Sequence, residues 1–215
     1  HTVLYCCFLG NQHVGENLLN KLINNRISKK NTETNNECEE SLYAFIFRSG
    51  YVFTELIEKI KTNFKNYTIF RSNEYGNDII PSIQAINYLN NEFISTKNSE
   101  IDYVYKLHTK SDETMFNDCV NYLLEKTTED LIGEIDYERS NCVGNPKCYE
   151  SVKREAVNKE IDELYKNEID SNKIFMATTN FFCDNIVIKE VITFLEQNNY
   201  RSWFLNNMYD NNHVN

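Results

Sequence analysis

Hydrophobic residues in this chain form short uninterrupted runs, which alternate with segments where they recur every three or four positions. Such runs are typical of buried strands, and the wider spacing predicts amphipathic helices. The runs predict strands near residues 3–9, 43–48, 67–71, 103–108 and 174–180. The spaced segments predict helices over residues 14–23, 52–60, 79–89, 116–124, 150–165 and 186–195. This alternation predicts an α/β fold with a mostly parallel sheet flanked by helices.

The polar segment at residues 28–41 has no hydrophobic period, so we expect a surface loop there. No internal repeat or shift in composition divides the chain. A length of 215 residues is enough for one domain with a substantial core. The sequence therefore predicts a single α/β domain over residues 1–215.

Composition and charge narrow the class of protein. A hydrophobic content of 41% fits a globular protein, and the net charge of −10 argues against nucleic acid as a partner. No apolar run approaches the ~20 residues of a membrane span, and nothing resembles a signal peptide, so we expect a cytoplasmic protein. The seven cysteines lack zinc-site spacing and are expected to be reduced thiols. The acidic cluster of Glu134, Asp136 and Glu138 follows no predicted strand and is interpreted as a solvated face, so no metal site is predicted.

Polar segments follow three of the predicted strands. We expect the ligand-binding residues in these segments, which are called strand exits below. They read "SNEYGNDIIP" after the third strand, "HTKSD" after the fourth and "ATTNFFCDN" after the last. In parallel sheets, ligands bind beyond the carboxyl ends of the strands. The three segments are therefore the candidate binding elements.

His108 and Lys110 form the most suggestive pair among these residues. Residues two apart on a strand share a face, so both side chains are expected to project together. A cationic pair at this edge suits a phosphate or diphosphate, whose developing charge a transferase must stabilise. The alternative is a solvated strand end in which Ser111 or Asp112 caps the next helix.

The segment "YGNDIIP" also has two interpretations. Gly76 permits a tight turn, Asp78 is a good N-cap and Pro81 fits the first turn of a helix, so capping alone explains all three. In the functional interpretation, the helix N-terminus faces the ligand and Asp78 contacts sugar or ribose hydroxyls.

Three segments in order resemble the rhamnan-synthesis-type polysaccharide glycosyltransferases and related domains of large DNA viruses. They are "NEYGNDIIP" at residues 73–81, "YKLHTKSD" at 105–112 and "FMATTNFFCDN" at 175–185. The resemblance extends from the first strand to about Tyr209. It implies a nucleotide-sugar-transferase-like fold, GT-A-like or Rossmann-like, and a role in polysaccharide biosynthesis, in a viral context.

The resemblance also implies roles for individual residues. Candidate donor-binding residues are His108, Lys110, Asp78, Gly76 and Asn73. Candidate acceptor-side residues are Thr178, Thr179 and Asn180. The nearest candidates for a catalytic base are Asp112 and Asp184, each of which also has a capping explanation.

Two departures from the family pattern stand in the sequence. The family's Gly-Arg-Asp is Gly76-Asn77-Asp78 here, which removes a cation. A terminal His…Glu-Arg segment is not found before Asn215, which is consistent with a fragment of a longer protein. The chain also has no Asp-x-Asp, the usual manganese or magnesium site of such enzymes, so a divalent cofactor remains an open alternative to the charges of His108 and Lys110.

The leading hypothesis is a glycosyltransferase that moves a sugar from a nucleotide-sugar donor to a glycan acceptor. One alternative is a non-catalytic carbohydrate- or nucleotide-binding module of a larger glycan-building protein. A purely structural α/β interaction domain is the third.

Overall fold

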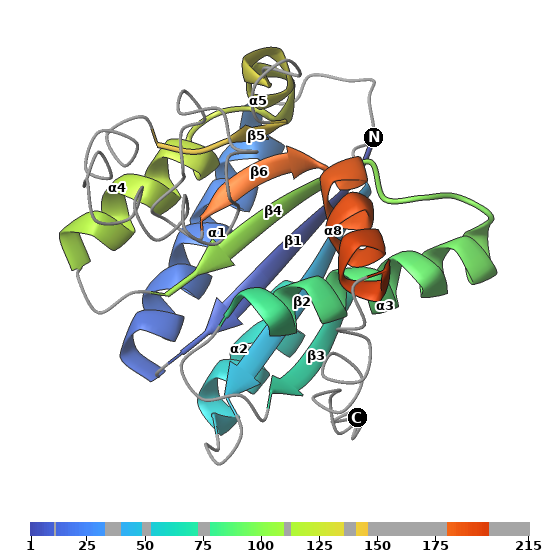
Figure 1. Ribbon diagram of the computed structural model, residues 1–215. Coiled ribbons are helices and arrows are strands. Elements are labelled where there is room, and N and C mark those ends of the chain that lie inside the picture. Colours follow the sequence, from blue (N-terminus) through green and yellow to red (C-terminus); the bar gives the residue numbers. More distant parts are fainter. Residues whose placement is uncertain are drawn as a thin grey trace, which may run out of the picture.

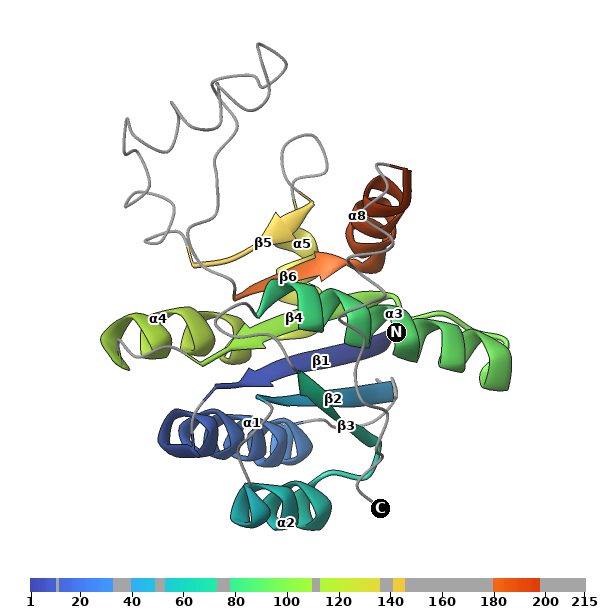
Figure 2. The same ribbon diagram turned by 60° about the horizontal axis from the view of Figure 1, so that its bottom comes forward.

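The computed structural model describes residues 1–10, 12–32, 40–48, 53–72, 78–109, 113–135, 141–145 and 180–197. These residues build a six-stranded sheet with helices on both faces (Figure 1 and Figure 2). The strands are β1 (Thr2–Leu9), β2 (Glu40–Arg48), β3 (Tyr67–Ser72), β4 (Tyr103–His108), β5 (Cys142–Val143) and β6 (Phe181–Asp184). The helices are α1 (Gln12–Thr32), α2 (Thr54–Asn63), α3 (Ile79–Lys97), α4 (Glu113–Leu124), α5 (Thr128–Glu134) and α8 (Asn185–Gln197).

The sheet is mixed but mostly parallel. Its strand order is β3-β2-β1-β4-β6-β5. Strands β1 to β4 are parallel to one another, whereas β6 runs antiparallel to both β4 and β5. The expected α/β fold with a mostly parallel sheet is therefore confirmed.

Strand β1 is buried along its whole length, because it is central in the sheet and helices cover both faces. Its odd-numbered side chains pack with helices α1, α2, α4 and α5, and its even-numbered side chains pack with α3 and α8. The continuous apolar run "TVLYCCFL" supplies a hydrophobic side chain to each face in turn. Two hydrophobic cores, one on each side of the sheet, follow from this alternation.

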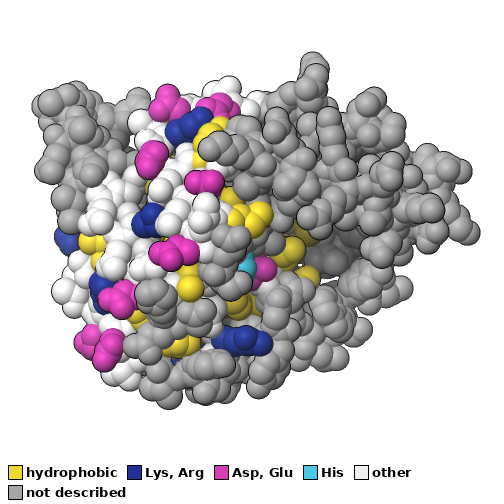
Figure 3. Space-filling view, turned by 90° about the vertical axis from the view of Figure 1, so that its left-hand side faces the viewer, with side chains coloured by type: hydrophobic (Ala, Val, Ile, Leu, Met, Phe, Trp, Pro, Cys, Tyr) yellow, Lys and Arg dark blue, Asp and Glu magenta, His cyan; other side chains and the backbone are white. Residues whose placement is uncertain are grey.

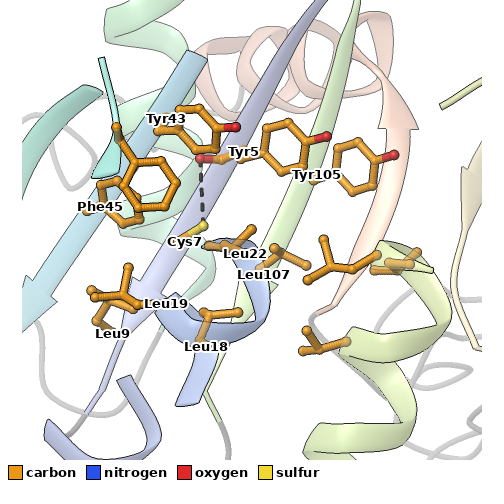
Figure 4. Close-up of a cluster of buried hydrophobic side chains, with 14 of the residues drawn as sticks. Tyr5, Cys7, Leu9, Leu18, Leu19, Leu22, Tyr43, Phe45, Tyr105 and Leu107 are labelled. Carbon is orange, nitrogen blue, oxygen red and sulfur yellow. Dashed lines mark hydrogen bonds between the residues drawn. The ribbon is translucent and has the colours of Figure 1, made fainter. Parts of the chain in front are cut away.

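An aromatic row crosses three adjacent strands in the larger core (Figure 4). Tyr5 pairs in register with Tyr43 on one side and Tyr105 on the other. Its ring stacks on both neighbours, with centroid separations of 5.1 Å and 4.5 Å. Each such pair contributes roughly 0.5–1.5 kcal/mol beyond the area that it buries. The row ties β2, β1 and β4 together in a fixed register.

Several predicted boundaries differ from the structure. The expected loop at residues 28–41 is shorter, because α1 continues to Thr32 and β2 already begins at Glu40. The extension of α1 beyond its hydrophobic segment contains no Gly or Pro that would end the helix. The short helix α5 was not predicted. It begins with a capping box, in which Thr127 and Asp130 bond each other's backbone N–H groups.

Strand β6 begins directly after the range predicted for the last strand. The described strand is Phe181–Asp184, antiparallel to β4, whereas most of residues 174–180 lie outside the described ranges. A hydrophobic run shows that a strand is buried but carries no information on its direction. The helix predicted over residues 150–165 also lies outside the described ranges.

Five cysteines in the described ranges are free thiols: Cys6, Cys7, Cys119, Cys142 and Cys183. Cys38 and Cys148 lie outside these ranges. Within the same ranges, no helix has the length and apolar character needed to cross a membrane.

Candidate functional site

The candidate site lies where the strand order reverses, at the carboxyl ends of β1 and β4. Strands β1, β2 and β3 extend to one side, and the chain then returns through α3 to place β4 on the other side of β1. Ligands of open parallel sheets bind beyond the carboxyl ends of the strands at such a reversal. Figure 3 views the molecule from the side toward which β1 and β4 point. A histidine side chain shows there beside an acidic one and several hydrophobic ones.

Backbone and side-chain hydrogen bonds fix the ends of these two strands against each other. The Thr109 N–H donates to the Phe8 carbonyl oxygen at 3.2 Å, and the Gly10 N–H donates to Thr109 Oγ1 at 2.8 Å. A Cβ atom on Gly10 would lie only 2.9 Å from that hydroxyl oxygen. This close approach favours glycine at position 10, and the two hydrogen bonds hold the backbone next to His108 in place.

Lys106 and Asp78 form a buried ion pair beside these strand ends. The Lys106 ammonium group contacts Asp78 Oδ2, and the two side chains are only 2% and 12% exposed. Lys106 lies on the face of β4 that α3 covers, whereas Asp78 immediately precedes the first turn of α3. A buried charge is tolerated only when it is paired, so each side chain depends on the other.

His108 is the outward member of the same group. Its Nδ1 atom lies 3.5 Å from Asp78 Oδ2, and its side chain is 22% exposed. The ring also packs at 5.7 Å, centroid to centroid, from the ring of Phe8. Exposure therefore increases from Lys106 through Asp78 to His108, and the imidazole is the group among these three that is best placed to meet a ligand.

The Asp78 side chain forms the ion pair with Lys106 and not the capping hydrogen bond that the first of the two interpretations expects. Asp78 is the N-cap residue of α3, but its side chain makes no capping hydrogen bond. Instead the Ser82 hydroxyl donates to the Asp78 carbonyl oxygen at 2.6 Å. Pro81 lies in the first turn of α3, as expected. The carboxylate is thus directed across to β4.

Asn180 joins the third segment to the same place. Its side-chain oxygen accepts a hydrogen bond from the His108 backbone N–H at 2.6 Å, and the residue is fully buried. Asn180 therefore supports His108 from the start of β6. The acceptor-side role of Asn180 stays a prediction.

Asp184 does not join this group. It pairs with Tyr103 at the opposite end of β4, five residues before His108, which at ~3.3 Å per residue is roughly 17 Å away. Its Oδ1 atom accepts a hydrogen bond from the Ile186 N–H at 2.8 Å, at the start of α8. The structure thus supports the capping explanation for Asp184 and places it outside the candidate site.

The remaining predicted site residues lie outside the described ranges. They are Asn73, Gly76, Lys110, Asp112, Thr178 and Thr179. They belong to residues 73–77, 110–112 and 146–179, which are not described. Asp78, Thr109 and Asn180 are the described residues that border these three ranges.

Arg48 is a further cation at this edge, and it lies outside the three polar segments predicted as binding elements. Arg48 is the last residue of β2. In the sheet, Ile46 of β2 pairs with Phe8 of β1, and Phe8 pairs in turn with His108 of β4. Since Arg48 lies two residues beyond Ile46, it is on the same face as His108. The sequence "FIFRSG" contains the pattern that would have indicated Arg48: a basic residue at the end of a hydrophobic strand. His108 has the same position in "YKLH". The role of Lys106 could not be predicted from a local pattern, because its ion-pair partner Asp78 is distant in the sequence.

No three His, Cys, Asp or Glu side chains gather as metal ligands in the part of the chain that the structure describes. A hollow of about 250 Å³ is found at the opposite, amino-terminal edge of β2 and β3, and Tyr67 and Phe93 are among its lining residues. It contains no residue of the candidate site, so the chemistry is assigned to the carboxyl edge on the basis of charge and strand order.

A search of protein-family models and of curated proteins found no match to this chain.

Proposed function

We propose that the chain is a glycosyltransferase, with a GT-A-like or Rossmann-like fold, that moves a sugar from a nucleotide-sugar donor to a glycan acceptor. One observation carries the proposal: members of three separate sequence segments meet at His108. Asp78 comes from the first segment, Lys106 and His108 from the second and Asn180 from the third. These are the segments on which the resemblance to polysaccharide glycosyltransferases rests.

The chemistry of the group suits a departing nucleoside diphosphate. The nucleoside diphosphate gains negative charge as the bond between its oxygen and the anomeric carbon of the sugar breaks, and fixed positive groups stabilise that charge. Lys106 compensates the charge of Asp78, so a protonated His108 gives the cluster a net positive charge. Arg48, on the same face of the sheet, supplies a guanidinium group whose geometry matches phosphate oxygens.

Roles follow for the individual residues. His108 and Arg48 contact the donor diphosphate, together with Lys110 on the same segment. Asp78 and Lys106 hold the imidazole in place, and Asn180 holds its backbone. Asp112 is proposed as the catalytic base in preference to Asp184, which pairs with the opposite end of β4.

The test is a screen of UDP-, GDP-, ADP-, dTDP- and CMP-sugars with the purified chain, with and without manganese. Thermal stabilisation measures binding, and release of the free nucleotide measures turnover. We expect one nucleotide class to stabilise the protein and to be hydrolysed slowly or transferred to an added glycan. The variant His108→Ala should lose both effects. The variant Lys65→Ala, which removes an exposed cation at the opposite edge of the sheet, should keep both.

Each outcome of this screen separates the alternatives. Thermal stabilisation without any nucleotide release would indicate a binding module and contradict the enzymatic proposal. An absence of stabilisation by every sugar nucleotide would contradict both and favour a structural α/β domain.

A further inference from the structure

Cys142 and Cys183 face each other across the antiparallel strands β5 and β6. The two residues are paired directly in register. Directly opposite residues in antiparallel strands have Cα atoms about 4.5–5.5 Å apart, within the range of about 4.4–6.8 Å that a disulfide spans. Their thiols are hydrogen-bonded to each other. A bond between the two sulfur atoms therefore needs little movement of the backbone.

We propose that Cys142 and Cys183 form a reversible cross-strand disulfide when the protein meets a small-molecule disulfide such as oxidised glutathione. The inference is independent of the proposed transferase activity, because it rests on the pairing of two strands at the edge of the sheet.

The two thiols have different exposure and different acidity. Cys142 is half-buried, whereas Cys183 is fully buried. The hydrogen bond with Cys183 lowers the pKa of the Cys142 thiol. The same hydrogen bond, with burial, raises the pKa of Cys183 well above its ordinary value. Since the thiolate is the attacking species, Cys142 is the thiol that reacts first with an oxidant from solution.

The reaction proceeds in two exchange steps. The Cys142 thiolate attacks one sulfur atom of glutathione disulfide, the S–S bond of that molecule breaks, and one glutathione leaves as a thiolate that takes up a proton. Cys183 then loses its proton, its sulfur attacks the Cys142 sulfur, and the second glutathione leaves. The protein gives up two hydrogen atoms in total, and one glutathione disulfide is reduced to two glutathione thiols.

The other described cysteines provide an internal contrast. Cys6 and Cys7 are neighbours in sequence, but their side chains belong to the cores on opposite faces of the sheet. Both are fully buried, and burial raises the pKa of Cys6 to about 12 and that of Cys7 well above its ordinary value. These thiols are therefore expected to stay reduced under conditions that oxidise the Cys142–Cys183 pair.

Oxidation would strengthen an otherwise weak edge of the sheet. Strand β5 has two residues and is held by two residue pairs with β6. The disulfide would close a long loop in the unfolded chain and so reduce its conformational entropy. We expect the oxidised protein to melt several degrees higher, and reduction with dithiothreitol to reverse the shift.

The test equilibrates the folded protein with glutathione buffers of increasing oxidised fraction, followed by alkylation, intact-mass measurement and peptide mapping. We expect the loss of two hydrogen atoms and a cross-linked peptide that contains Cys142 and Cys183. The variant Cys183→Ser should stop at one bound glutathione on Cys142. The matched variant Cys119→Ser, which alters a buried cysteine on α4, should form the same cross-link as the parent.

Two results would overturn the proposal. One is recovery of Cys142 and Cys183 as separate alkylated thiols at every buffer ratio. The other is a disulfide that joins Cys142 to Cys38 or Cys148 instead. Peptide mapping of the parent protein decides between these outcomes even if a variant fails to fold.

Discussion

Lys106 carries a charge in a position where an apolar residue would be expected. It lies in the middle of the hydrophobic strand β4, and its ammonium group is satisfied by the carboxylate of Asp78. A buried ion pair need not add net stability, because its desolvation cost can equal its attraction. We infer that the ion pair also has a positioning role, which is to hold the Asp78 carboxylate beside His108.

Loss of one partner of this pair is expected to be costly. The variant Lys106→Met should lower the free energy of unfolding by about 3 kcal/mol, because Asp78 keeps a buried charge without its main partner. The double variant Asp78→Asn with Lys106→Met should recover more than half of that loss. Urea unfolding of the four proteins in a double-mutant cycle measures the coupling. Additive effects of the two substitutions would show that the pair does not interact.

The guanidinium group of Arg48 is expected to act on ligand binding. The variant Arg48→Ala should weaken binding of the nucleotide sugar by about 1.5–3 kcal/mol, the range for a hydrogen bond to a charged group. The variant Arg48→Lys should recover part of the loss, since a lysine keeps the charge but not the forked geometry. Titration calorimetry measures the affinity of each variant for the nucleotide sugar, with Lys65→Ala as the control variant. Lower stability with unchanged binding would assign Arg48 a structural role.

At the scale of single elements, helix α5 shows how a short segment is specified locally. The Thr127 hydroxyl oxygen accepts the Asp130 N–H at 3.1 Å, and the Asp130 carboxylate accepts the Thr127 N–H at 3.2 Å. The variant Thr127→Ala should therefore lower the free energy of unfolding by about 1 kcal/mol, as is typical for loss of an N-cap. An unchanged urea midpoint would show that α5 is held by its packing alone.

The same capping box predicts a pH dependence. Hydrogen bonds from Thr127 hold the pKa of Asp130 below its ordinary value of 3.8. The stabilisation is therefore complete above pH 3.8 and is lost as the pH falls through the lower pKa of the folded state. The variant Asp130→Asn should have a lower urea midpoint than the parent at neutral pH, with a difference that shrinks in acid. Glu129→Gln, which removes a neighbouring exposed charge, should show no such convergence.

Elements differ in how well the sequence specifies them. The first four strands were predicted within a few residues, because a central parallel strand is hydrophobic on both faces and stands out from its surroundings. The hydrophobic run does not predict that β6 is antiparallel to β4, since strand direction depends on where the preceding segment returns to the sheet. Helix α5 was missed because a seven-residue helix has too few turns to show a hydrophobic period.

At the scale of the whole molecule, the strand order explains why distant segments form one site. The reversal between β1 and β4 brings the end of β4 beside the end of β1, and α3 crosses the sheet so that Asp78 meets β4. The place of Asp78, His108 and Asn180 at predicted strand exits marks them as candidate site residues. Their contacts with one another, and the part of Lys106, depend on tertiary packing that no local pattern records.

The most direct measurement follows the imidazole signals of the protein by NMR during titration with the nucleotide sugar that gives the largest thermal shift. The chain has four histidines, and comparison with His108→Ala assigns the signal of His108. We expect the His108 signal to move with saturation at the same ligand concentration that stabilises the protein, while the other three stay in place. Saturable binding that leaves the His108 signal unchanged would contradict a donor site at the carboxyl ends of β1 and β4.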